Sequence, residues 1–326
     1  FMLLSPEIHL FLIGLAVIVA GNGLFKPNIS TMVGKLYAPG DVRRDSGFTI
    51  FYMGINAGAF VAPRITAVWI GAHYGYKCGF HAAAIGMIFG IAVFQVRKGM
   101  LGHVGKSPAG REGWGPVLNV LVGAILLVPV IYFLLSQSEI LGVVLLALFA
   151  GLAVYLIWSG YSETSVQGQK YIAMFLLFTA NILFWALFEQ AGASLNFLAQ
   201  DHVNAPFHFT LFQSANPMFI VLLAPVFAMM WPWLDKMNMN PSIPRKFAIA
   251  LIGMAAGFAL LVFALKNFLG PDDRIGWYWL AGLYLIHTMA ELCLSPIGLS
   301  MVTKLAAPKN VGLSMGGWFL ATAVAN

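Results

Sequence analysis

Charged side chains are scarce in this sequence. Asp, Glu, Lys and Arg make up 9% of its 326 residues, whereas hydrophobic residues make up 60%. Soluble domains average about 25% charged residues, so the composition excludes an ordinary soluble protein. An apolar run of about 20 residues is long enough to cross a bilayer as a helix. The composition therefore predicts an all-α, polytopic membrane protein that is surrounded by lipid.

Cysteine is scarce as well, and the basic residues are scattered. Cys78 and Cys293 lie in different segments without a C-x-x-C pair, which indicates neither a disulfide framework nor a metal site. The formal net charge is +6, but the basic residues lie in short loops rather than on one face. We therefore expect no nucleic-acid partner, no metal and no cofactor.

Apolar runs alternate with loop signals along the whole chain. They predict nine spans and the beginning of a tenth near residue 310. The nine are 10–34, 47–72, 78–96, 117–135, 140–158, 171–199, 207–234, 246–269 and 277–303. These spans must be helices, because backbone polar groups in lipid have to be hydrogen-bonded within their own segment. The chain begins with Phe1 and ends within an apolar run, so we expect an internal fragment of a longer protein.

The loops alternate in their content of lysine and arginine. The rich loops hold Lys35, Arg43, Arg44, Arg97, Lys98, Lys106, Arg111, Lys170, Lys236, Arg245, Lys246, Lys304 and Lys309, and the poor loops hold Lys77, Lys266 and Arg274. Basic residues gather on the cytoplasmic side of membrane proteins. The rich loops are therefore predicted to be cytoplasmic, and the first span runs from outside to inside.

Two neighbouring spans carry almost no polar side chain. Residues 117–135 contain only Asn119 as a strongly polar residue, and residues 140–158 contain none. We expect this helix hairpin to face lipid, to carry no chemistry and to separate two functional halves. The predicted domains are a partial N-terminal helix bundle (1–98), a loop, hairpin and linker (99–168), and a partial C-terminal bundle (169–326).

Four ionisable residues lie within predicted spans, namely Lys26, Arg64, Glu189 and Glu291. Such residues cost about 2.5–3.5 kcal/mol at the centre of a span and usually mark function. Lys26 and Glu291 lie at similar depths, roughly 21–24 Å from the outer end of their helices at 1.5 Å per residue. Their opposite charges predict a salt bridge between the two halves. The bridge is either a static ion pair or one that opens and closes during transport.

Glu189 lies in FWALFEQAGASLNF (184–197), which is too polar for a lipid face. We expect Glu189 to be a buried carboxyl group beside water, either for proton coupling or held structurally by hydrogen bonds. Arg64 is expected to snorkel to the outer interface. His287 precedes Glu291 by one helical turn, so it is either a hydrogen-bonded structural histidine or part of a proton relay.

Polar residues stand next to prolines at Lys26-Pro27, Asn216-Pro217 and Ser295-Pro296. A proline removes one helical hydrogen bond and permits bending. Helices that are interrupted beside buried polar groups are typical of transporters.

Five stretches together resemble the proton-dependent oligopeptide transporter family of the major facilitator superfamily. They are GNGLFKPNISTMVGKLY (21–37), RRDSGFTIFYMGINAGAF (43–60), FWALFEQAGASLNF (184–197), QSANPMFIVLLAP (213–225) and ELCLSPIGLSMVTKLAAP (291–308). The resemblance implies that the chain begins at the family's fourth core helix and ends in the eleventh. It also implies that the hairpin is the extra helix pair of bacterial members.

The resemblance implies roles for particular residues. Lys26 would hold the peptide carboxylate, and Glu291 would hold the peptide amine and pair with Lys26. The other implied site residues are Asn56 and Asn216 for the peptide backbone and amine, Trp185 and Trp318 for side-chain pockets, Glu189 for protonation, and Tyr52 and Ser295 as further substrate contacts. Arg64 departs from the apolar residue that is usual in the family and receives no role.

The resemblance implies proton-coupled symport of di- and tripeptides by alternating access, in the cell membrane of a bacterium. The alternatives are a carrier of another small solute, such as an amino-acid conjugate, nitrate or a peptide-like drug, and a non-transporting membrane sensor or scaffold. An enzyme is disfavoured. The one adjacent acidic pair, Asp272-Asp273, follows Gly270-Pro271, and that combination indicates a turn.

Overall fold

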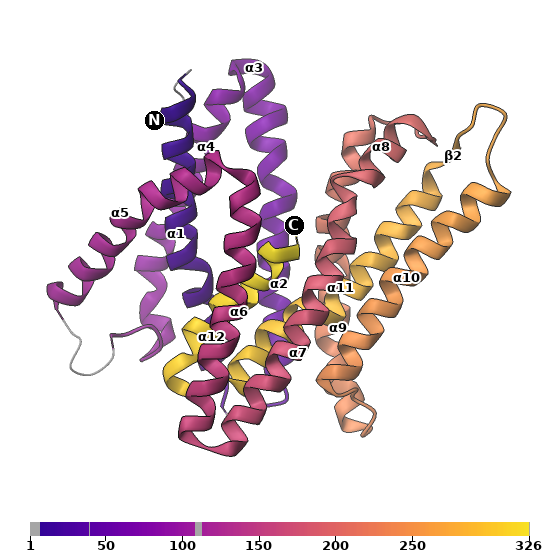
Figure 1. Cartoon of the computed structure of the whole chain (residues 1–326). Helices are drawn as coiled ribbons and strands as arrows, with labels where there is room; N and C mark the ends of the chain where they lie inside the picture. Colours follow the sequence, from indigo (N-terminus) through magenta and orange to yellow (C-terminus); the bar gives the residue numbers. More distant parts are fainter. Residues whose placement is uncertain (1–6, 39, 108–112, 326) are drawn as a thin grey trace. The chain divides into compact units, whose positions relative to one another are not determined.

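The computed structural model describes residues 7–38, 40–107 and 113–325, and it is almost entirely helical (Figure 1). Arg111 of the predicted basic loop lies outside the described residues. The first helices are α1 (Ile8–Lys35), α2 (Arg44–Pro63), the π-helix η2 (Arg64–Gly71), α3 (Ala72–Tyr74), α4 (Tyr76–Arg97), the 3-10 helix η3 (Lys98–Leu101), α5 (Trp114–Ser136) and α6 (Ser138–Glu163).

The second part of the chain continues the helical pattern. It contains α7 (Ser165–Phe188), the 3-10 helix η4 (Glu189–Ala191), α8 (Ser194–Asp201), η5 (Phe209–Ser214), α9 (Ala215–Lys236), α10 (Ile243–Asn267), α11 (Trp277–Leu305), η6 (Pro308–Asn310) and α12 (Val311–Ala325). Two short strands, β1 (Val203–Asn204) and β2 (Ile275–Gly276), pair in parallel.

Within the described residues, nine helical segments are long and apolar enough to cross a membrane. They correspond in order to the nine predicted spans, which confirms the all-α, polytopic class. The tenth predicted segment begins at Val311 with α12.

Three predicted spans differ from continuous α-helices. The span at 47–72 changes from α2 to the π-helix η2 after Pro63, a residue that has no backbone N–H to donate. The span at 171–199 is interrupted by η4 and by Ala193, whose backbone is not helical (φ −114°, ψ −101°). The span at 207–234 becomes α-helical only at Ala215.

The helices form two compact units. Unit 1 contains the described residues up to Leu36 together with Val61–Leu148, and unit 2 contains Tyr37–Phe60 together with Phe149–Asn326. In unit 1, α1 packs against α5, and η2 packs against α4. The predicted division of the chain into three consecutive domains stays a prediction.

Helix α11 is the core of unit 2. In its most apolar stretch 83% of the residues are buried, whereas none is buried in the corresponding stretch of α5. Helix α11 is buried because α7, α9, α10 and α12 all pack against it (Figure 1). Close approach to α10 requires glycine, because a Cβ on Gly253 would lie 2.8 Å from the Cβ of Ala290.

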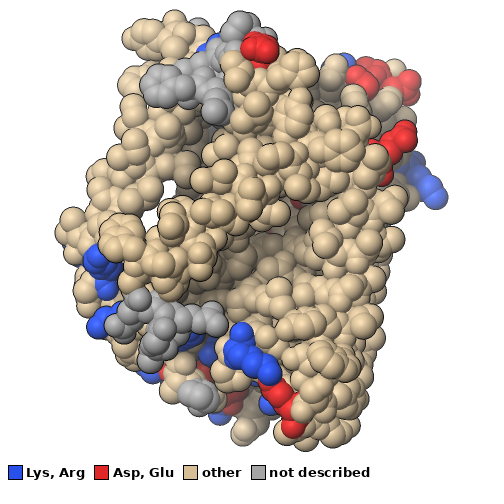
Figure 2. All heavy atoms as spheres, turned by 60° about the vertical axis from the view of Figure 1, so that its left-hand side comes forward, with Lys and Arg blue, Asp and Glu red and all other residues tan. Residues whose placement is uncertain are grey.

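Large apolar side chains are exposed on many helices, including both helices of the predicted hairpin. On the face shown in Figure 2, broad areas contain neither basic nor acidic side chains. Such surfaces are unfavourable in water and suit contact with lipid.

Candidate functional site

The centre of unit 2 holds a buried carboxylate, that of Glu291 on α11, which is 2% exposed. Its Oε1 accepts a hydrogen bond from the Tyr52 hydroxyl of α2. Its Oε2 accepts one from the Asn216 side-chain amide of α9 at 2.6 Å. Hydrogen bonds to an ionised group are about twice as strong as neutral ones. Side chains from two other helices, α2 and α9, therefore converge on this carboxyl group.

The face of α11 that carries Glu291 is polar over two turns. Thr288, Glu291 and Ser295 follow one another at spacings of three and four residues, which places them on one side of a helix. Thr288 Oγ1 accepts a hydrogen bond from Asn216 at 3.1 Å. Ser295 is 3% exposed, and its Oγ has no hydrogen-bond partner among the described residues.

Asn56 lies one turn after Tyr52 on α2 and is buried. Its side-chain amide donates to the Tyr52 carbonyl oxygen at 3.0 Å. The two predicted contacts from the FYMGIN stretch therefore lie on the same face of α2. Tyr52 and Asn216 are hydrogen-bonded to Glu291. Asn56 lies one turn from Tyr52, and Ser295 lies one turn from Glu291. The structure thus brings these five predicted site residues close together.

The two tryptophans among the predicted site residues differ in their packing. Trp185 on α7 is half-buried, and its ring packs edge-on against Phe188. Its Nε1 is buried and has no acceptor among the described residues. Trp318 on α12 is buried, and it packs edge-on against Phe178 and Phe247. Trp318 therefore fills the core here, and its contact with substrate stays a prediction.

Glu189 is exposed in the structure, so the expectation of a buried carboxyl group is wrong for this chain. The physical reason is local. The helix is interrupted at η4, and Glu189 begins that short turn. Polar side chains nearby have other partners: Ser194 donates to the Gln190 side chain at 2.8 Å, and Gln213 donates to the backbone carbonyl of Ala191 at 2.7 Å. The role of Glu189 in proton coupling stays a prediction.

Lys26 is an exposed residue of α1 and belongs to unit 1. The helix continues through Pro27, whose carbonyl accepts a hydrogen bond from Thr31 Oγ1 at 2.8 Å. Arg64 is likewise an exposed residue of unit 1, at the start of η2. The bridge between Lys26 and Glu291 stays a prediction.

His287 is buried, and its Nε2 contacts the Met254 carbonyl at 3.2 Å. A carbonyl oxygen can only accept, so Nε2 carries the proton. The ring packs against Phe188 and Phe258. This arrangement favours the structural histidine over the proton relay.

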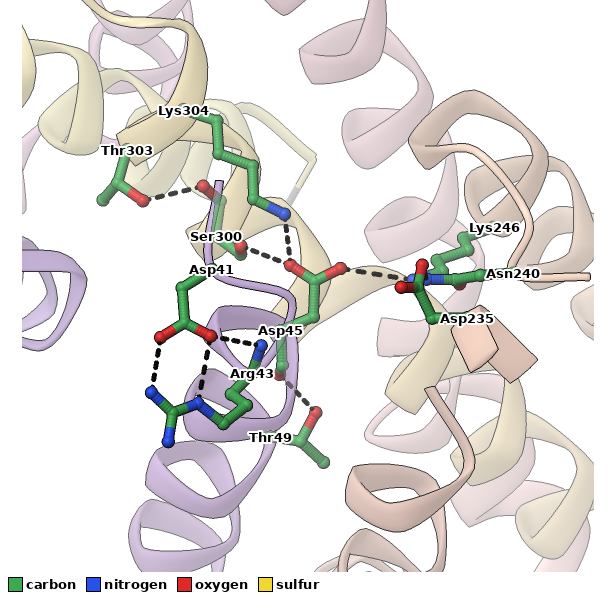
Figure 3. A network of polar contacts seen from close by, with 10 residues as sticks. All are labelled: Asp41, Arg43, Asp45, Thr49, Asp235, Asn240, Lys246, Ser300, Thr303 and Lys304. Atoms are coloured by element: carbon green, nitrogen blue, oxygen red, sulfur yellow. Dashed lines mark hydrogen bonds and ion pairs between the residues drawn. The ribbon is translucent and has the colours of Figure 1, made fainter. Parts of the chain in front are cut away.

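A second polar centre, which no sequence motif indicated, lies at Asp45 in the first turn of α2 (Figure 3). Asp45 Oδ1 accepts hydrogen bonds from Ser300 at 2.6 Å and from Lys304 at 2.5 Å, both on α11. Asp45 Oδ2 pairs with Lys246 Nζ of α10 at 3.2 Å. We call these four residues the Asp45 cluster.

The Asp45 cluster joins the beginning of α2 to α10 and α11, and contacts beside it reach α9. Lys246 is 1% exposed, and its Nζ lies 4.0 Å from the ring centroid of Trp231 on α9. The neighbouring Ser46 donates to the Ala228 carbonyl of α9 at 2.6 Å. The distribution of lysines among the loops does not reveal this cluster, because the positive-inside rule treats Lys246 as a charge exposed to solvent.

Two further ion pairs lie between the spans or at the end of one. Arg43 donates to both carboxylate oxygens of Asp41, and these hydrogen bonds lower the pKa of Asp41 to about 2. Lys309 pairs with Glu163 at 2.5 Å, and this hydrogen bond raises the pKa of Lys309. Among the described residues, no group of three or more His, Cys, Asp or Glu side chains could hold a metal ion.

Comparison with known proteins gives consistent matches. A family model described as the POT family matches residues 4–326. Peptide transporter YePEPT of Yersinia enterocolitica subsp. palearctica is 36% identical over 97% of this chain and 66% of its own length. Dipeptide and tripeptide permease B of Aliivibrio fischeri is 31% identical over 99% of this chain and 66% of its own length. The chain therefore spans just under two thirds of these relatives.

Solved structures match at the level of the fold. A peptide transporter POT in complex with sulfate is 36% identical, with a TM-score of 0.69, over 99% of this chain and 68% of that chain. A POT family transporter in complex with 5-aminolevulinic acid is 30% identical, with a TM-score of 0.68, over 94% of this chain and 66% of that chain. The helices described above are thus part of the fold of these transporters.

Proposed function

The chain belongs to the POT family, and on this premise we propose that the protein containing it is a symporter that couples the uptake of di- and tripeptides to protons. Membership confirms the resemblance that the five sequence motifs indicated. It places the chain in a transporter family rather than an enzyme family, and the chain is a multi-pass protein of the cell membrane. The printed names of the relatives, a peptide transporter and a dipeptide and tripeptide permease, support the substrate class.

The observation that carries the proposal is the carboxylate of Glu291, buried and held from α2 and α9. A peptide has an ammonium group at one end, and a buried carboxylate binds such a group by charge-assisted hydrogen bonds. Ser295 Oγ and Trp185 Nε1 are buried polar atoms without partners among the described residues, so they are available to polar groups of a peptide. Asn56 and Asn216 supply amides for the peptide backbone.

The carboxylate end of the peptide needs a cation, and Lys26 is the proposed one. We propose that Lys26 also pairs with Glu291 and that this bridge closes the cytoplasmic side. Protonation of Glu291 removes one charge of the bridge, and a bound peptide pairs with one of its charges. Each event therefore weakens the bridge. Glu189 is the second proposed proton-coupling residue.

The finer assignment of the fold is part of the same proposal. Residues 1–98 would supply family core helices four to six, and residues 169–326 would supply helices seven to ten and the start of the eleventh. Helices α5 and α6 would be the extra pair of bacterial members. Their largely exposed apolar side chains support this assignment.

The test is uptake of labelled dialanine into liposomes that contain the native protein, driven by an inward proton gradient. We expect accumulation that an ionophore abolishes. Glu291→Gln and Lys26→Ala should each abolish it, because each removes one charge of the proposed pair. Glu139→Gln and Lys266→Ala are matched controls at exposed helix ends. Normal accumulation by both test variants would refute the mechanism.

A second candidate is a carrier of another small solute. The observation that favours it is the family structure that holds 5-aminolevulinic acid, at 30% identity to this chain. Competition with labelled dialanine separates the candidates: 5-aminolevulinic acid should compete only weakly if peptides are the substrates. A sensor or scaffold would accumulate neither solute.

A further inference from the structure

We propose that the Tyr52 hydroxyl and the substrate's ammonium take turns on Glu291 Oε1, and that the hydroxyl moves to Ser295 Oγ when the ammonium binds. Tyr52 then weakens the binding of a free amine by competing with it, and it does not hold the peptide. This inference rests on the proposed function, because it assumes that Glu291 receives the amine.

The first argument is how the two oxygens of Glu291 are held. Asn216 donates to Oε2 and also to Thr288 Oγ1, so it is anchored at two points. Among the described residues, the Tyr52 hydroxyl donates only to Oε1 of Glu291. An incoming donor can therefore replace Tyr52 with the loss of one hydrogen bond, whereas replacing Asn216 disturbs two.

The second argument is the neighbouring acceptor. Ser295 follows Glu291 by one helical turn on the same face of α11 and is 3% exposed. The Tyr52 hydroxyl contacts Glu291, one turn away, and Ser295 Oγ has no hydrogen-bond partner among the described residues. A buried hydroxyl without a partner is unfavourable. When the Tyr52 hydroxyl leaves Glu291, it donates to Ser295 Oγ instead. Tyr52 thus keeps one hydrogen bond, and Ser295 gains one.

The exchange discriminates between substrates by charge. An ammonium group makes a charge-assisted hydrogen bond with a carboxylate, which is stronger than the bond from a neutral phenol. The ammonium therefore displaces the hydroxyl. An N-acetylated peptide has only a neutral amide at that end and leaves the hydroxyl on Glu291, so its affinity does not depend on Tyr52.

The experiment measures the Kd of dialanine and of N-acetyl-dialanine for the purified native protein and for Tyr52→Phe. We expect Tyr52→Phe to lower the Kd of dialanine roughly threefold to tenfold, because one neutral hydrogen bond no longer has to be exchanged. The Kd of N-acetyl-dialanine should not change. Tyr284→Phe is the matched control, since Tyr284 is buried on α11 and its hydroxyl has no partner among the described residues.

Ser295→Ala supplies an independent arm. In the native background it should raise the Kd of dialanine by a similar factor and by more than the Kd of N-acetyl-dialanine. In the Tyr52→Phe background its effect should be smaller, because no hydroxyl remains to be received and only a contact with the peptide is lost. A higher Kd of dialanine in Tyr52→Phe, equal shifts for both peptides, or an equal Ser295→Ala effect in both backgrounds would each overturn the exchange. Failure of the native protein to bind either peptide would instead refute the proposed function.

Discussion

Replacing Asp45 with asparagine should destabilise the protein far more than an ordinary surface substitution. Asp45→Asn keeps the size of the side chain but removes the charge that faces Lys246, whose side chain is 1% exposed. Two unit charges 3.2 Å apart interact by about 5 kcal/mol at an effective dielectric constant near 20. Breaking a buried pair from one side costs about 3–5 kcal/mol. Lys304 lies 2.5 Å from Asp45 and is a third exposed, so solvent screens part of its attraction to Asp45.

The assay is thermal or denaturant unfolding of the purified protein, with Asp201→Asn as the matched control on an exposed aspartate. Asp45→Asn should lower the free energy of unfolding by about 3–5 kcal/mol. Lys246→Met should cost less, because Asp45 keeps Lys304 and Ser300 as partners. The double variant Asp45→Asn/Lys246→Met should recover most of the loss, since no buried charge remains. A loss no larger than that of Asp201→Asn, or no recovery in the double variant, would refute the reasoning.

Two further predictions concern single side chains. Asn216→Ala removes the donor to one Glu291 oxygen and should raise the KM for dialanine roughly tenfold. Asn267→Ala, at the exposed end of α10, is the control and should leave the KM unchanged. Equal kinetics of the two variants would contradict the role assigned to Asn216. Arg43→Gln should bring the pKa of Asp41 from about 2 up toward about 4, as carboxyl NMR would show. The stabilisation that comes with a lowered pKa is present above the unfolded pKa of about 4 and is lost as the pH falls toward 2. At pH 6 Asp41 is ionised with either pKa, so uptake there should not respond, and a response would contradict the assignment.

Much of the fold was predictable because the relevant information is local. An apolar run of about 20 residues indicates a span wherever it occurs, and the nine spans follow directly. The interruptions were harder to predict. The change to a π-helix after Pro63 and the break at Ala193 depend on how the helices pack, and a hydropathy pattern does not contain that information.

The site was predictable in its members but not in its contacts. Glu291, Asn216 and Tyr52 were identified through motifs, yet the hydrogen bonds that join them cross from α11 to α9 and α2. The Asp45 cluster was missed, because a lysine near a helix end is usually solvated, whereas Lys246 turns inward between Asp45 and a tryptophan ring. Long-range pairing of this kind is a tertiary property.

The central claim is that Glu291 receives the amine of a peptide. The most direct test compares the Kd of dialanine with that of N-acetyl-dialanine for the native protein and for Glu291→Gln, with Glu139→Gln as the control. The native protein should prefer the free amine by roughly tenfold or more, as expected for a hydrogen bond to a charged group. Glu291→Gln should lose this preference while Glu139→Gln keeps it. An undiminished preference in Glu291→Gln would contradict the account.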